Sequence, residues 1–134
     1  MKILQINTVF PYGSTGKIVE CIHDTLMHEN DFESVVVYGN GKSLHNKNIY
    51  KIGNVILGKY NALLSRITGV MYGGCFFSTN KLIGIIKKEK PDLVHLHCLN
   101  GHFVNIYRLV TWLKKHSIKT VLTLHAEFMY TGGC

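Results

Sequence analysis

Two apolar runs of this chain, residues 91–97 and 120–125, both end on a histidine. Both are rich in leucine and β-branched residues, the composition of buried strands. Residues 101–117 between them have the pattern of a loop followed by a helix. If both runs are parallel strands, His97 and His125 lie together at the carboxyl edge of one sheet. Open α/β sheets bind ligands at that edge, so we expect these imidazoles to serve chemistry rather than packing.

The rest of the chain alternates between strand and helix patterns in the same way. Further strands are expected at residues 3–10, 32–38 and 49–52, and helices at residues 17–28, 54–71, 79–90 and 104–116. Strands that alternate with helices and read as continuous apolar runs are typical of a parallel sheet covered on both faces. The sequence therefore predicts one α/β domain over residues 1–134, a Rossmann-like three-layer αβα fold with a mainly parallel sheet.

The predicted helix over residues 54–71 is strongly amphipathic. One face collects apolar side chains, and Lys59 and Arg66 lie off that face. We expect the apolar face to pack in the core, with peripheral contact to a membrane surface as the alternative. Among the histidines, His23, His28, His45 and His116 are expected in solvent, and His95 in the core.

Composition narrows the class of protein and of partner. The chain has 46% hydrophobic residues and a net charge of +7, which indicate a packed domain that favours anionic partners. Its lysines are scattered and no nucleic-acid recognition motif is present, so we expect no nucleic-acid binding. Four dispersed cysteines indicate reduced thiols and a cytoplasmic location. The first apolar run is too short to cross a membrane and has no signal cleavage site.

A glycine-containing segment, Gly13-Ser14-Thr15-Gly16-Lys17, separates the first strand from the first helix. Glycines allow close approach of the backbone to a ligand, and a helix amino terminus attracts phosphate. The spacing fits neither the P-loop nor the dinucleotide fingerprint. Two interpretations stay open, a phosphate-approaching turn and a tight turn that binds nothing.

Three histidines, His97, His102 and His125, are expected to converge at the sheet edge. Cys98 or Cys134 could add a metal ligand, but the spacing matches no standard zinc pattern, so we expect no metal and no cofactor. Hydrogen bonding to a polar substrate is the favoured role. Loop residues beside these histidines complete the candidate site: Asn100, Gly101 and Glu127, the last of which is either a site carboxylate or a solvated side chain.

The motifs that carry this site are Pro-Asp-Leu-Val-His-Leu-His at residues 91–97, Asn-Gly-His-Phe-Val-Asn-Ile at residues 100–106, Thr-Leu-His at residues 123–125, and Thr-Gly-Gly-Cys at residues 131–134. In this order, after a glycine-containing turn, they resemble the amino-terminal half of bacterial retaining GT-B glycosyltransferases. The nearest subgroup makes exopolysaccharide, capsule or O-antigen. The resemblance covers nearly the whole chain.

This resemblance implies a domain that holds the acceptor, facing a second domain that holds the nucleotide sugar. Gly13 and Gly16 would approach the donor diphosphate, His125 would match the active-site histidine, and His97 and His102 would line the acceptor side. Two positions depart from the family pattern. Ala126 stands where an aspartate is usual, and Phe128 and Met129 occupy a stretch where a tryptophan is common.

The expected function is that of an acceptor-side domain, which works with a nucleotide-sugar co-substrate and a glycan or lipid-linked acceptor. Because the chain ends at Cys134, before a donor domain, we expect it to be inactive alone. We expect it to act in the cytoplasm, at the inner face of the membrane. The alternative is a non-catalytic binding module that docks on a separate donor-domain chain. That alternative requires an exposed apolar patch.

Overall fold

The structure is a computed structural model in which residues 1–44 and 46–125 are described. Several predicted features lie outside the described residues. They are His45, Glu127, the departures at residues 126, 128 and 129, and the closing motif at residues 131–134 with Cys134.

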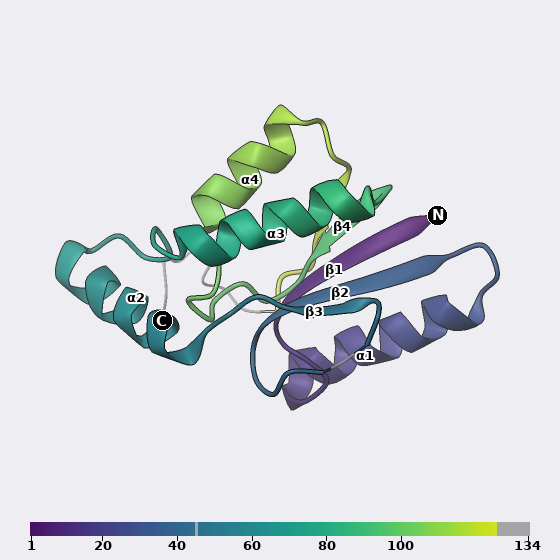
Figure 1. The fold of residues 1–134 in the computed structure, drawn as a ribbon, viewed down its shortest axis with the longest axis horizontal. Helices are drawn as coiled ribbons and strands as arrows, with labels where there is room; N and C mark the ends of the chain where they lie inside the picture. Colours follow the sequence, from purple (N-terminus) through teal and green to yellow (C-terminus); the bar gives the residue numbers. More distant parts are fainter. Residues whose placement is uncertain (45, 126–134) are drawn as a thin grey trace.

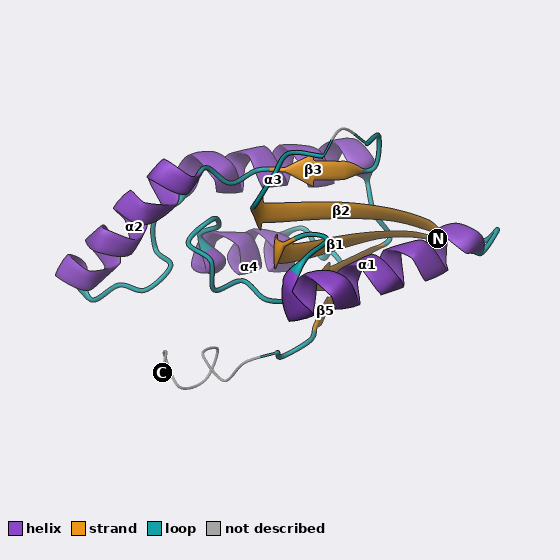
Figure 2. Ribbon diagram, turned by 90° about the horizontal axis from the view of Figure 1, so that it is seen from below, coloured by secondary structure: helices purple, strands orange, loops and turns teal. Residues whose placement is uncertain are grey.

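Five parallel strands form a single sheet (Figures 1 and 2). The strands are β1 (Lys2–Val9), β2 (Glu33–Asn40), β3 (Ile49–Lys51), β4 (Leu93–Leu96) and β5 (Thr120–Leu122). Their order across the sheet is β3-β2-β1-β4-β5, and every neighbouring pair is parallel. Each β-branched or leucine-rich run that the sequence marked as a strand thus enters the sheet, and the predicted parallel topology is confirmed.

Four helices connect these strands: α1 (Gly13–His28), α2 (Val55–Thr68), α3 (Phe76–Glu89) and α4 (Ile106–Lys115). Asparagine side chains cap two of them. Asn54 accepts hydrogen bonds from the amides of Ile56 and Leu57, and Asn105 accepts one from the amide of Arg108. Helices α3 and α4 lie on one side of the sheet and α1 lies on the other (Figure 1). The Rossmann-like three-layer α/β/α fold is therefore confirmed.

The two faces of the sheet differ in polarity, because successive side chains of a strand alternate between faces. The face toward α3 and α4 is apolar and includes Leu4, Ile6, Val94 and Leu96. The face toward α1 carries polar side chains in this part of the sheet. They are Gln5 and Asn7 of β1, His95 of β4, and His97 directly after β4. The polar row at the candidate site is thus part of one sheet face.

His23 is a correction to the sequence analysis, which placed it in solvent. It is only 7% exposed, and its Nδ1 lies 2.8 Å from the Ser34 hydroxyl, which also accepts a hydrogen bond from Gln5 Nε2 at 3.2 Å. The Phe10 ring packs edge-on against it. Because the sheet face under α1 is itself polar, a polar residue on the inward side of that helix finds a partner there.

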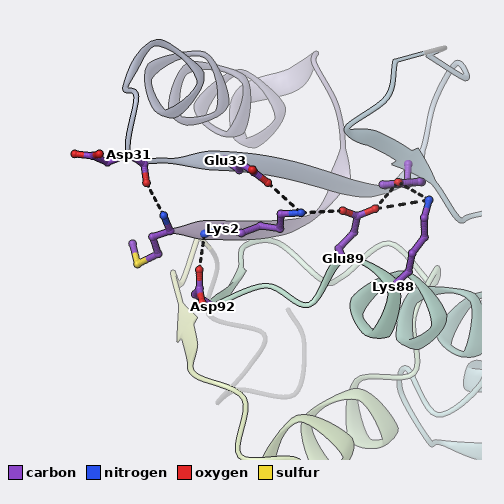
Figure 3. Close-up of polar contacts among 8 residues, drawn as sticks. Lys2, Asp31, Glu33, Lys88, Glu89 and Asp92 are labelled. Carbon is purple, nitrogen blue, oxygen red and sulfur yellow. Dashed lines mark hydrogen bonds and ion pairs between the residues drawn. The ribbon is translucent and has the colours of Figure 1, made fainter.

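Acidic side chains gather at the amino-terminal edge of the sheet (Figure 3). The ammonium group of Lys2 lies between the carboxylates of Glu33, at 3.0 Å, and Glu89, at 3.4 Å. Glu89 also accepts a hydrogen bond from the Tyr50 hydroxyl at 2.6 Å, and this bond, with the nearby Lys2, lowers the pKa of the Glu89 carboxyl. These contacts join the beginnings of β1 and β2 to the end of α3.

Helix α2 is the second correction, since its apolar side chains do not pack in the core. Among its apolar residues Ile56 is 78% exposed and Leu63 is 55% exposed, and Ser65 is the one side chain recorded as buried. Figures 1 and 2 show the reason: α2 lies beyond the carboxyl ends of the strands, so no sheet surface faces it. Within the described residues, no helix has the length and apolar character needed to cross a membrane.

The position of α2 outside the core can be tested with two identical substitutions. Leu82 of α3 is fully buried against the sheet, so Leu82→Ala should lower the free energy of unfolding by about 2–5 kcal/mol. Leu63→Ala on α2 removes the same atoms from an exposed site, so it should change the free energy of unfolding by less than about 0.5 kcal/mol. Urea denaturation measures both. Equal losses in the two variants would show that α2 packs in the core.

Candidate functional site

The candidate site lies where β1 and β4 are neighbours. From β1 the chain goes to β2 on one side of the sheet, whereas from β4 it goes to β5 on the other side. The loops that follow β1 and β4 therefore diverge at the carboxyl edge. In α/β sheets this switch point is where a ligand crevice forms.

Asn7 joins the two sides of this switch point. Its side-chain amide donates to the Val9 carbonyl at 2.8 Å and to the Thr15 hydroxyl at 3.3 Å, and its Oδ1 accepts from the Cys98 amide at 3.1 Å. The side chain is fully buried. One amide group therefore holds the end of β1, the first turn of α1 and the end of β4 together, so the glycine-containing segment and the histidine strand do lie at one edge.

The glycine-containing segment begins α1 instead of preceding it. The helix starts at Gly13, four residues before the predicted start. Tyr12 is the N-cap residue, and its side chain makes no capping hydrogen bond. Gly13 has a φ of +70°, which favours glycine, and a Cβ at Gly16 would lie 3.3 Å from the Val9 carbonyl oxygen. The amide groups of Gly13, Ser14 and Thr15 therefore belong to the first turn of α1, where a phosphate is attracted.

Lys17 contributes less free charge than the sequence suggests. Its ammonium group forms an exposed ion pair with Glu20, one helical turn along α1, at 2.6 Å. The positive end of the α1 dipole, rather than Lys17, is then the main electrostatic feature at this turn.

His97 and His125 are brought together, as predicted. Nδ1 of His97 lies 3.2 Å from Nε2 of His125, and the two rings are stacked with centroids 5.5 Å apart. The His95 ring packs against the His97 ring, with the two centroids 3.9 Å apart. Nε2 of His95 lies 2.8 Å from the Thr123 hydroxyl. Three imidazoles, one within β4, one directly after β4 and one in the segment after β5, thus form one cluster.

Burial favours the neutral form of two of these imidazoles, His95 and His97. His97 is only 2% exposed, and burial, followed by the nearby His95 and His125, lowers its pKa to about 3. Burial also lowers the pKa of His95. In its neutral form an imidazole has one donor nitrogen and one acceptor nitrogen. Nε2 of His97 is buried and has no hydrogen-bond partner among the described residues.

The loop after β4 is held by close backbone contacts. A Cβ at Gly101 would lie 2.3 Å from the Thr8 methyl carbon, and the Gly101 carbonyl accepts a hydrogen bond from Asn40 Nδ2 at 3.1 Å. Thr8 donates to the Cys98 carbonyl at 2.7 Å, and the Asn100 amide oxygen accepts from the Cys98 thiol at 2.9 Å. Gly101 and Asn100 therefore lie beside the carboxyl ends of β1 and β2, and their role in lining a ligand site stays a prediction.

His102 does not join the other histidines. Its ring packs against Tyr72 with centroids 4.8 Å apart, and burial lowers its pKa. Among the described residues no hydrogen bond or ring contact links it to His97 or His125. It lies instead in the wall of a groove between α2 and α3, where its Nδ1 is buried without a partner. Of the three histidines that were expected to converge, His97 and His125 do so and His102 does not. The third member of the observed cluster is His95.

Sequence reasoning missed Asn7, Thr8 and Asn40. The available signal was position, because each is a polar residue at the carboxyl end of an otherwise apolar strand. No group of three or more histidine, cysteine or acidic side chains in residues 1–44 and 46–125 is arranged to hold a metal ion.

Comparisons with known proteins give no family. No protein-family model matches this chain, and no curated protein or solved structure matches it significantly. The resemblance to glycosyltransferases therefore stays a prediction that rests on the motifs.

The buried neutral His97 makes stability depend on pH. Because its folded-state pKa is depressed, the folded protein binds fewer protons than the unfolded chain below about pH 6.5, and stability falls as the pH decreases. His97 should account for about 2–3 kcal/mol of lost stability between pH 7 and pH 4.5. Urea denaturation of wild type and His97→Gln at both values measures this. An unchanged pH dependence in His97→Gln, or an equal change in the exposed control His28→Gln, would contradict the assignment.

The role of Asn7 predicts a second stability effect. Asn7→Ala removes the acceptor of the Cys98 amide and the donor to Val9, so it should lower the free energy of unfolding by about 1–3 kcal/mol. Asn30→Ala, at an exposed position, is the matched control and should be near neutral. Amide hydrogen exchange at Cys98 gives a local measurement. Unchanged protection there would show that Asn7 does not hold the end of β4.

Proposed function

We propose that this chain is the acceptor-side domain of a glycosyltransferase, which transfers a sugar from a nucleotide-sugar donor to a glycan or lipid-linked acceptor. The observation that supports it most lies at the switch point between β1 and β4, where Nδ1 of His97 is 3.2 Å from Nε2 of His125. Crevices at that position are where α/β sheets bind their ligands.

Two parts of this edge of the sheet suit the two halves of such a reaction. In sugar transfer the bond between the anomeric carbon and the diphosphate breaks, and the acceptor hydroxyl oxygen bonds to that carbon while its proton leaves. The first turn of α1 offers amide groups and a positive dipole end to the diphosphate. The neutral His97 and the His125 ring beside it would offer hydrogen bonds to uncharged sugar hydroxyls.

Titration with substrates tests this proposal directly. Amide chemical shifts of the ¹⁵N-labelled chain would be recorded with UDP-glucose, with GDP-mannose and with a short oligosaccharide acceptor. We expect the changes to centre on Gly13, Cys98 and Gly101, and to weaken about tenfold in His97→Ala because a buried hydrogen-bonding group is lost. The exposed variant His116→Ala should bind as the wild type does. Shifts that avoid these residues for all three ligands would overturn the proposal.

Turnover gives an independent measurement. The chain incubated alone with nucleotide sugars and a lipid-linked acceptor should release no nucleoside diphosphate above background, because the donor-holding half of the reaction site is supplied elsewhere in this proposal. Release at rates usual for enzymes would show that these residues form a complete transferase.

A further inference from the structure

The outer face of α2 has the residue spacing of a helix that pairs with another helix. Ile56, Tyr60, Leu63 and Ile67 are separated by four, three and four residues, which is the spacing of the a and d positions in a heptad repeat. These four residues form the α2 seam. Their side chains are 78%, 59%, 55% and 73% exposed, in that order. Apolar side chains at this spacing fit between the side chains of a second helix.

The α2 seam lies on the side of the helix that faces away from the domain. Ser65 is buried, and a Cβ at Gly58 would lie 3.5 Å from the His102 carbonyl oxygen, so these two residues mark the inner side of α2. Successive residues of a helix are about 100° apart, which places the seam opposite to them. Helix α2 extends beyond the sheet in both views (Figures 1 and 2), so a partner would have access to the seam.

Helix α2 is already formed and held in place by the domain. The Asn61 side-chain oxygen accepts a hydrogen bond from the Cys75 amide at 3.2 Å, which joins α2 to the start of α3, and Asn54 caps its first turn. An isolated helix of this length would be marginal in water. Because the domain supplies the order, a partner helix would meet a preformed surface.

The charges beside the seam are positive and lie on one flank. Lys59 and Arg66 are seven residues apart, so they share one heptad position, next to Tyr60 and Ile67. Neither forms an ion pair with another described residue. Residues 34–88 contain no aspartate or glutamate, so the helix and its neighbours in the sequence supply no carboxylate. Charges at flanking positions select the partner in helix pairs, and this flank favours an acidic one.

A second copy of this chain is a poorer partner for the seam. Two antiparallel α2 helices would bring Lys59 and Arg66 of both copies to the same side of the pair, where like charges repel. Two parallel helices would place these cations beside the apolar Leu57 and Leu64. A bilayer surface also fits less well, because helices that lie on bilayers carry lysine and arginine along much of their polar face. Helix α2 has two cations, both on one flank.

We propose that the α2 seam pairs with an amphipathic helix of another protein, and that carboxylates of that helix pair with Lys59 and Arg66. The heptad spacing indicates that the partner is a helix, and the cations beside the seam indicate its charge. On the other flank, Leu57 and Leu64 line a groove of about 380 Å³ between α2 and α3, which leaves room for apolar side chains of the partner. This inference goes beyond the proposed function and does not depend on sugar transfer.

A synthetic three-heptad peptide serves as the partner in the test. The acidic peptide has leucine at positions a and d and glutamate at positions e and g, so repulsion between its own glutamates keeps it unpaired. Binding is measured by fluorescence anisotropy of the labelled peptide. Addition of the peptide to the ¹⁵N-labelled chain should shift the amide signals of Tyr60, Leu63 and Ile67.

Two further peptides show what the seam recognises. A basic peptide with lysine at positions e and g should bind about tenfold more weakly than the acidic one, because it meets Lys59 and Arg66. A peptide with the composition of the acidic one, but with its leucines out of heptad order, should also bind about tenfold more weakly. That second comparison removes simple attraction between an acidic peptide and a basic domain as an explanation.

Substitutions in the seam locate the binding surface. Ile67→Asn should weaken binding of the acidic peptide about tenfold, because it places a polar group in the helix interface. Ile18→Asn makes the same change at an exposed position of α1 and should leave binding unchanged. Leu63→Ala, which should barely alter stability, should weaken binding about threefold. Thermal unfolding checks that each variant is folded.

Substitutions on the flank test the charge. The double variant Lys59→Gln, Arg66→Gln should lose the preference for the acidic over the basic peptide, because no cation is left beside the seam. The double variant Lys114→Gln, Lys115→Gln removes two exposed cations from α4 and lowers the net charge by the same amount. It should keep the preference.

Three results would overturn the proposal. The first is equal affinity of the wild-type chain for the acidic and basic peptides, or undiminished binding by Ile67→Asn. The second is a dimer of the chain alone, seen by analytical ultracentrifugation and abolished by Ile67→Asn, which would assign the seam to a second copy. The third is binding to phosphatidylglycerol vesicles that Ile67→Asn abolishes, without binding of the acidic peptide, which would assign the seam to a bilayer surface.

Discussion

The parallel pairing of β1 with both β2 and β4 is the constraint on which the rest of this structure depends. It places β1 in the centre of the sheet and makes the chain turn in opposite directions on its two sides. The carboxyl ends of β1 and β4 are then adjacent, and Asn7 can reach both the first turn of α1 and the Cys98 amide. The histidine cluster and the position of the glycine-containing segment both follow from this arrangement.

The molecule is divided by charge and polarity along the strand direction. Carboxylates are concentrated around Lys2 at the amino edge, whereas the carboxyl edge carries the neutral imidazole of His97 and the buried amide of Asn7. Helix α2 extends from the carboxyl edge with its apolar side chains exposed.

Much of the fold and part of the site could be predicted, and the failures have a common physical cause. The strands and the meeting of His97 with His125 were predictable, because apolar runs and the geometry of parallel strands are local or follow from topology. His23 and α2 were predicted wrongly for opposite reasons. His23 looked solvent-exposed but meets Ser34 on a polar sheet face, and α2 looked like a core helix but meets no sheet. Periodicity tells which residues share a face and does not tell what that face contacts.

The sequence by itself determined the order of strands and helices, the apolar cores of β1, β2 and β4, and the histidines at the strand ends, because these depend on residue type and spacing. The tertiary structure alone decided that His102 lies against Tyr72, that Asn7 and Gly101 hold the ends of the strands together, and that α2 borders an open groove. Each of these depends on contacts between segments far apart in the chain, and such contacts exist only when the sheet has brought those segments together.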